Sequence, residues 1–138
     1  MPTWCGRKTG QHQPSRLLRR DPGLLHGSCP DALILCHQTS RRSIANYPEA
    51  AKLRIPPLPE YVRLYESIGA AVHPTKVIGI SLNTYDLSDA DARSACAQAE
   101  RETGLPATDP VRFNAGPLVT AIGEERKRYL AIRQQETE

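Results

Sequence analysis

The chain has 138 residues, of which 39% are hydrophobic and 5% aromatic, which fits one domain with a small core. No segment approaches the roughly 20 apolar residues needed to cross a membrane. The N-terminus also lacks the apolar run of a signal peptide, so we expect a cytoplasmic protein. The four cysteines form no C-x-x-C pair and are expected to be free thiols, with Cys36 and Cys96 on apolar faces.

The chain has a net charge of +3, and its excess of basic groups lies in the first 22 residues. Residues 1–22 hold five basic groups and one acidic group, whereas the other 116 residues hold 13 basic and 14 acidic groups. The segment has no sustained period, and we expect it to be disordered or foreign to the domain that follows. It has no repeated basic spacing and one aromatic residue, Trp4, which argues against nucleic-acid binding.

Two short apolar runs predict buried strands. Residues 31–37 and 76–82 are continuously apolar over most of their length, which indicates strands covered on both faces. Residues 105–111 are short and contain two prolines, which suits a third strand at the edge of a sheet. Residues 38–58 are polar and rich in proline, so we expect a long loop there.

Three other segments predict helices. Apolar residues recur at helical steps over residues 59–72, and residues 89–103 carry a stripe of mostly alanine. Ser88 suits the N-cap of this second helix, and Gly104 suits its C-cap. A last helix is expected over residues 118–134, with an apolar first half and a highly charged, solvated second half.

The order of these elements predicts an α/β fold. Strands that alternate with helices at this spacing form right-handed βαβ units and a parallel sheet, with helices in layers on its two faces. Three strands are few for such a sheet, and both faces and at least one edge would need more cover. We therefore expect a partial sheet from which other strands are missing.

Polar side chains follow each of the three predicted strands. The active sites of open α/β sheets lie beyond the C-terminal ends of the strands, so these side chains are candidates to bind a ligand in one crevice. Asp109 and Arg112 could instead pair with each other. The candidates are His37, Arg41, Asn83, Thr84, Asp109 and Arg112.

Three of these candidates also have a simpler interpretation. His37 could act as a base or contact a phosphate, but a histidine hydrogen-bonded to a loop is the more common case. Arg41 or Arg42 could bind an anion through its guanidinium fork, or be an ordinary surface residue. Asn83 could bind a base or a carboxylate, or serve the backbone of a strand-to-helix turn.

Several chemistries find no support in the sequence. Ser28, expected on a tight turn with Gly27, has no G-x-S-x-G motif around it, which argues against a serine hydrolase. Cys36 and His37 are adjacent, so on a strand they point to opposite faces, which argues against a metal site. The string from Cys5 to Thr9 lacks the glycines of a phosphate-binding loop.

From Gly23 onward the chain resembles a family of bacterial and archaeal two-domain proteins, long described as a domain of unknown function. The resemblance covers about 100 residues and rests on several short motifs in the same order. These motifs are Gly23 to Ser28, Pro30 to His37, Arg41, Asn46 to Pro48, Leu58 to Glu66, Val77 to Thr84, Glu102 to Pro106, Asp109 to Arg112, and Gly116.

The resemblance implies a C-terminal P-loop NTPase-like domain that follows a Rossmann-like domain. Some members are described as D-glutamate or D-aspartate N-acetyltransferases that use acetyl-CoA, so acetyl-CoA or ATP is the implied cofactor. Members carry the Rossmann-like domain and a phosphate loop upstream, and neither is found in these 138 residues. We therefore expect a truncated domain, residues 23–138, that is inactive alone. The alternatives are a small nucleotide- or CoA-binding module that acts with a partner chain, and a non-catalytic interaction protein or homo-oligomer.

Overall fold

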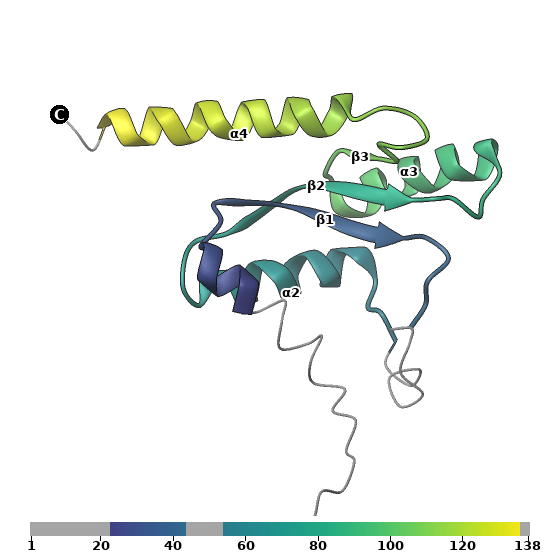
Figure 1. The fold of residues 1–138 in the computed structure, drawn as a ribbon, viewed down its shortest axis with the longest axis horizontal. Helices are drawn as coiled ribbons and strands as arrows, with labels where there is room; N and C mark the ends of the chain where they lie inside the picture. Colours follow the sequence, from purple (N-terminus) through teal and green to yellow (C-terminus); the bar gives the residue numbers. More distant parts are fainter. Residues whose placement is uncertain (1–22, 44–53, 136–138) are drawn as a thin grey trace, which may run out of the picture.

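The computed structural model describes residues 23–43 and 54–135, which form a parallel three-stranded sheet with helices on both faces (Figure 1). The predicted α/β fold is confirmed. The strands lie side by side in the order β1-β2-β3. The elements are β1 (Ala32–Gln38), α2 (Leu58–Ala70), β2 (Lys76–Asn83), α3 (Asp89–Thr103), β3 (Ala107–Thr108) and α4 (Gly116–Gln135).

Strand register brings the C-terminal ends of the three strands to one edge of the sheet. β1 pairs with β2 from Ala32↔Lys76 to Gln38↔Asn83, with one irregularity after Leu33. β3 adds two pairs to the other side of β2 and forms a very short edge strand, as its two flanking prolines favour. Every loop that follows a strand therefore starts from the same side of the molecule.

The core lies between the sheet and the helices α2 and α3. Its buried centre consists of side chains from β1 and β2, with Ala99 from α3 and Ala107 from β3. Ala92 and Ala99 are buried, and their small side chains let α3 lie close to the sheet. Tyr61 and Tyr65 of α2 pack against this core edge to face, with ring centroids 5.1 Å apart.

The prediction that both faces of β1 are covered is wrong. Leu35 is the buried residue of β1, and Cys36, which points to the opposite face, is exposed, contrary to its predicted place on an apolar face. α4 lies on that opposite face, where it contacts β2 and β3. Because β1 lies at the edge of the sheet, α4 leaves part of it open.

The ends of α3 form as the sequence predicts. Ser88 accepts a hydrogen bond from the backbone N–H of Asp91 at 3.2 Å, and Gly104 ends the helix with a φ of 69°. Proline opens α2 in its first turn, also as predicted. Gly27 and Ser28, in contrast, lie in a short helix over residues 23–28 rather than on a tight turn.

Helix α4 packs against the sheet mainly through its N-terminal end. Leu118 is its buried residue, and the charged segment 124–128 is largely exposed, as predicted. Among the described residues, no helix has the length and apolar character that a membrane crossing requires. The predictions for residues 1–22 and for Asn46 to Pro48 lie outside the described residues.

Candidate functional site

An open crevice of about 870 Å³ lies at the C-terminal ends of the strands. The loops after β1, β2 and β3 line it together, which is where open parallel sheets bind their ligands. The structure brings five of the six predicted candidates to this crevice and separates the sixth, Thr84, from it. The five are His37, Arg41, Asn83, Asp109 and Arg112.

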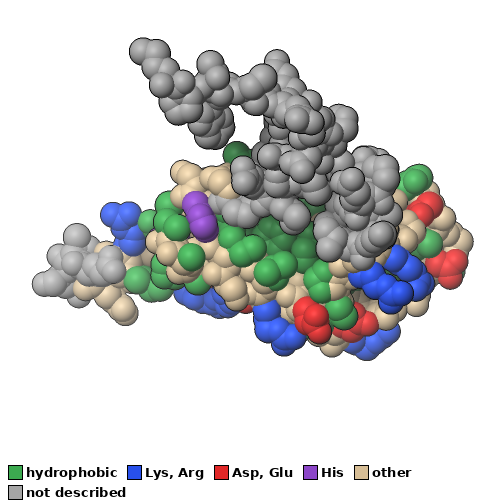
Figure 2. All heavy atoms as spheres, turned by 90° about the horizontal axis from the view of Figure 1, so that it is seen from below, with side chains coloured by type: hydrophobic (Ala, Val, Ile, Leu, Met, Phe, Trp, Pro, Cys, Tyr) green, Lys and Arg blue, Asp and Glu red, His purple; other side chains and the backbone are tan. Residues whose placement is uncertain are grey.

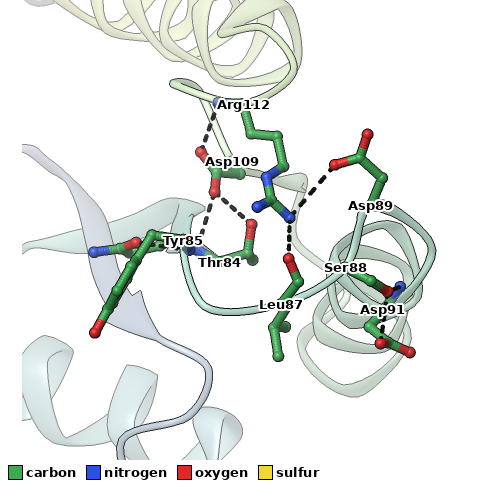
Figure 3. A network of polar contacts seen from close by, with 9 residues as sticks. Thr84, Tyr85, Leu87, Ser88, Asp89, Asp91, Asp109 and Arg112 are labelled. Atoms are coloured by element: carbon green, nitrogen blue, oxygen red, sulfur yellow. Dashed lines mark hydrogen bonds and ion pairs between the residues drawn. The ribbon is translucent and has the colours of Figure 1, made fainter.

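Thr84 is buried beneath the crevice, where it holds Asp109. Its hydroxyl donates a hydrogen bond of 2.6 Å to Asp109 Oδ2, and its backbone N–H donates one of 2.9 Å to the same oxygen (Figure 3). Thr84 itself has no exposed surface. Its hydroxyl is therefore committed to the protein and does not face a ligand.

Asp109 uses both carboxylate oxygens to organise the loop after β3. Its Oδ1 accepts hydrogen bonds of 3.0 Å from the backbone N–H groups of Val111 and Arg112. Burial would raise the pKa of Asp109, but the hydrogen bonds from Thr84, Arg112 and Val111 outweigh it and lower the pKa below its usual value. Asp109 is 4% exposed and stays ionised as an anchor of the crevice wall.

Arg112 contacts Asp109 through its backbone, and its side chain points elsewhere. The guanidinium donates a hydrogen bond of 2.8 Å to the carbonyl oxygen of Leu87 and lies 3.6 Å from Asp89 Oδ1 (Figure 3). The side chain therefore joins the loop after β3 to the start of α3. Thr84, Asp109 and Arg112 together form a network that shapes the crevice.

His37 lies at the end of β1 and Arg41 in the loop that follows. Their side chains take no part in the network of Thr84, Asp109 and Arg112. The His37 imidazole is partly buried, and desolvation lowers its pKa, with a further lowering by the positive charge of Arg41. His37 is therefore mostly neutral near pH 7 and can accept or donate one hydrogen bond. Arg41 is exposed, so its guanidinium is accessible to a ligand.

Asn83 combines a structural role with an accessible amide. Its Oδ1 accepts a hydrogen bond of 3.2 Å from the backbone N–H of Tyr85, which is the turn role expected of asparagine at this position. The side chain is exposed at the crevice, so its amide nitrogen can donate to a ligand. Tyr85, which the sequence analysis did not consider, lines the same crevice and is 72% exposed.

The uncommitted groups of the crevice suit an anionic ligand. Arg41 carries a full positive charge, and Asn83 and His37 offer neutral donors, a combination that suits a phosphate or a carboxylate. Asp109 keeps its negative charge and lines the same crevice, so an anion would be favoured beside Arg41 rather than beside Asp109. Within the part of the chain that the structure describes, no three His, Cys, Asp or Glu side chains gather to hold a metal ion.

Comparison with known proteins assigns the chain to a family. Residues 20–119 match the family described as "Domain of unknown function (DUF1611_C) P-loop domain". The chain belongs to this family. The match includes the three strands, α2, α3 and the loops that line the crevice of this DUF1611 chain.

Two relatives carry a functional name. The chain is 40% identical over 104 residues to a D-glutamate N-acetyltransferase of Tritonibacter scottomollicae, covering 72% of this chain and 29% of that protein. It is 31% identical over 101 residues to a D-glutamate N-acetyltransferase of a Pseudoalteromonas species, covering 72% and 30%. The matched part of this DUF1611 chain thus corresponds to less than a third of each relative.

A solved structure supports the same assignment. The crystal structure of a DUF1611 family protein from Anabaena variabilis is 40% identical, with a TM-score of 0.68. The match covers 75% of this chain and 30% of that protein. The same match shows similarity in both sequence and fold, so the sheet of this DUF1611 chain has the arrangement found in that family member.

Proposed function

We propose that the chain supplies the C-terminal part of an enzyme that transfers an acetyl group to the amino group of a D-amino acid such as D-glutamate. The 40% identity with the Tritonibacter scottomollicae D-glutamate N-acetyltransferase carries this proposal. Acetyl-CoA is the proposed donor, with ATP as the alternative ligand of the crevice. A cytoplasmic location remains a prediction.

The crevice at the strand ends would hold part of the anionic ligand. Arg41 would pair with a negative group, and Asn83 and His37 would donate hydrogen bonds beside it. Thr84 and Asp109 would keep the loops in place through their bonds to each other and to the backbone, and Arg112 would join the loop after β3 to the start of α3 through its Nη1.

The enzyme would need groups from outside these 138 residues. The chain corresponds to 29% and 30% of the two named relatives, so most of each relative has no counterpart in the match. These 138 residues also contain no G-x-x-x-x-G-K-[ST] motif to hold a phosphate. We therefore propose that the chain alone does not catalyse acetyl transfer.

A chimera tests the proposal. Residues 20–119 of this chain replace the matching segment of the Tritonibacter scottomollicae relative, and D-glutamate-dependent release of free thiol from acetyl-CoA is measured. The matched control carries the equivalent segment of the Pseudoalteromonas relative, which is itself named D-glutamate N-acetyltransferase. We expect activity from both chimeras and none from the chain alone. An active control beside a folded, inactive chimera would contradict the proposal.

The open edge of β1 favours a second candidate function, a nucleotide- or CoA-binding module that works with a partner chain. Among the described residues, β1 pairs with β2 alone, so its other edge is available to a further strand. A ligand that binds the folded state raises the melting temperature by mass action. A rise with acetyl-CoA or ATP on the isolated chain would support this module, and an unchanged melt would argue against it.

A further inference from the structure

A second hollow lies beside the strand-end crevice, between the loop after β1 and the helices α2 and α3. It has a volume of about 750 Å³, and three arginines line it, namely Arg41, Arg42 and Arg54, together with His37 and Glu102. We call it the arginine pocket. Figure 2 shows a group of basic side chains at the end of the molecule toward which β1 and β2 point in Figure 1.

The backbone holds these arginines near one another. Ser43 and Arg54 form an antiparallel bridge, and the N–H of Ile55 donates a hydrogen bond of 3.0 Å to the carbonyl oxygen of Arg42. Arg41 is close enough to His37 for its charge to lower the pKa of the imidazole. The pocket therefore gathers positive charge from both sides of the bridge.

This charge is not neutralised within the described part of the chain. There, none of the three guanidinium groups forms an ion pair or a hydrogen bond with a side chain. Glu102 is the acidic residue at the pocket, and its carboxylate accepts a hydrogen bond of 2.7 Å from Gln98. The first turn of α2 also borders the pocket, and Pro57 gives it no side-chain cap.

We propose that the arginine pocket binds an oxyanion, which is the carboxylate of an acidic amino acid or the phosphate of a coenzyme. Guanidinium groups match both oxyanions because their N–H groups form two parallel hydrogen bonds to a pair of oxygens. The start of α2 adds the partial positive charge of its helix dipole. The inference deepens the proposed function, since Arg41 and His37 line both hollows, and phosphate binding can be measured whether or not the chain takes part in acetyl transfer.

Direct binding to the full chain tests the site. Inorganic phosphate is titrated into isotope-labelled protein at low salt, and the NMR signals of the arginine Nε–H groups are followed. We expect saturable shifts of the pocket arginines. Arg42→Gln and Arg54→Gln should each weaken phosphate binding by about tenfold or more, since each removes a charge-assisted hydrogen bond.

Arg101→Gln is the matched control, because it removes one exposed positive charge from α3 outside the pocket. Phosphate binding should change little in this variant, and Arg42→Lys should keep part of it. An equal loss in the control would show attraction to net charge alone and would overturn the proposal. Unsaturable shifts, or none, in a protein that keeps its melting temperature would do the same.

Competition then identifies the source of the oxyanion. Displacement of phosphate by D-glutamate assigns the pocket to a carboxylate. Displacement by coenzyme A but not by dephospho-coenzyme A assigns it to a phosphate. Failure of all of these ligands to compete would overturn both assignments. These experiments measure binding and not acetyl transfer, so a negative result here would not contradict the function that the chimera tests.

Discussion

At the residue scale, Asp109 is the polar group on which the crevice most depends. Its carboxylate accepts four hydrogen bonds and is 4% exposed. Replacement by asparagine removes the charge and gives one carbonyl oxygen where two carboxylate oxygens accepted. We expect Asp109→Asn to lower the free energy of unfolding by about 1–3 kcal/mol in urea denaturation, as for a buried charged group that loses its partners.

The control for this variant is Asp86→Asn, which changes an exposed aspartate in the loop between β2 and α3. It should change the free energy of unfolding by less than about 0.5 kcal/mol, as surface substitutions usually do. Equal effects of the two substitutions would mean that the network around Asp109 adds nothing to stability.

The lowered pKa of Asp109 predicts a dependence of stability on pH. Its pKa in the folded state lies below the ordinary value of 3.8, so the unfolded state binds the proton more readily. The stabilisation is complete above that ordinary value and is lost as the pH falls through the lower pKa of the folded state. We expect the stability difference between the parent chain and Asp109→Asn to shrink on acidification from about pH 6 to about pH 3. A constant difference across that range would contradict the assigned pKa shift.

The sequence predicts the location of the polar side chains better than it predicts their hydrogen-bond partners. Asn83 and Asp109 each follow a strand, and because parallel strands end at one edge of the sheet, this position was enough to predict that both line one crevice. The bond between Asp109 and Thr84 depends on the pairing of β2 with β3, which no local pattern specifies. Arg54 was missed because it follows no strand, and it reaches the arginine pocket through its bridge to Ser43.

At the element scale, the attachment of α4 depends on the absence of a side chain at Gly79. A Cβ atom built there would lie 2.8 Å from Leu118 Cδ2 and 3.3 Å from Ile34 Cδ1. Since Leu118 is the buried residue of α4, it cannot move away without loss of its packing. We expect Gly79→Ala to destabilise the chain by about 1–3 kcal/mol in urea denaturation, the usual cost of overpacking.

Gly123→Ala provides the contrasting control. Gly123 lies in α4, and a Cβ there meets nothing within 4 Å. Alanine favours a helix over glycine by roughly 0.5–1 kcal/mol, so this variant should be more stable than the parent. Destabilisation by Gly123→Ala, or stabilisation by Gly79→Ala, would show that the contact between α4 and the sheet is looser than the structure indicates.

Elements whose ends are marked by capping residues were predicted well. Features set by strand pairing or by packing against other elements were not. α3 has the predicted bounds because Ser88 and Gly104 mark its ends. β3 is two residues long, shorter than the predicted strand over residues 105–111, because it pairs with β2 only through Ala107 and Thr108. The open face of β1 could not be read from its sequence, since an apolar strand looks the same whether or not another element covers it.

At the scale of the whole molecule, β1 leaves both a strand edge and an apolar face open. Its outer edge pairs with no other strand among the described residues. Leu24 is 70% exposed and borders the same surface hollow as Cys36 of β1. Such an edge is a template for another strand, whether from a partner or from a second copy.

We therefore expect the purified chain to self-associate through β1. Sedimentation should show a larger species as the protein concentration rises, and the melting temperature should rise with it. Cys36→Lys places a charge on an exposed position of β1 and should restore the monomer, because charged residues on edge strands oppose pairing. Val111→Lys, at a residue 96% exposed in the loop after β3, should leave association unchanged. A monomer at all concentrations with a sharp melt would show that the three strands form a self-sufficient sheet, and would remove the structural argument for a missing partner.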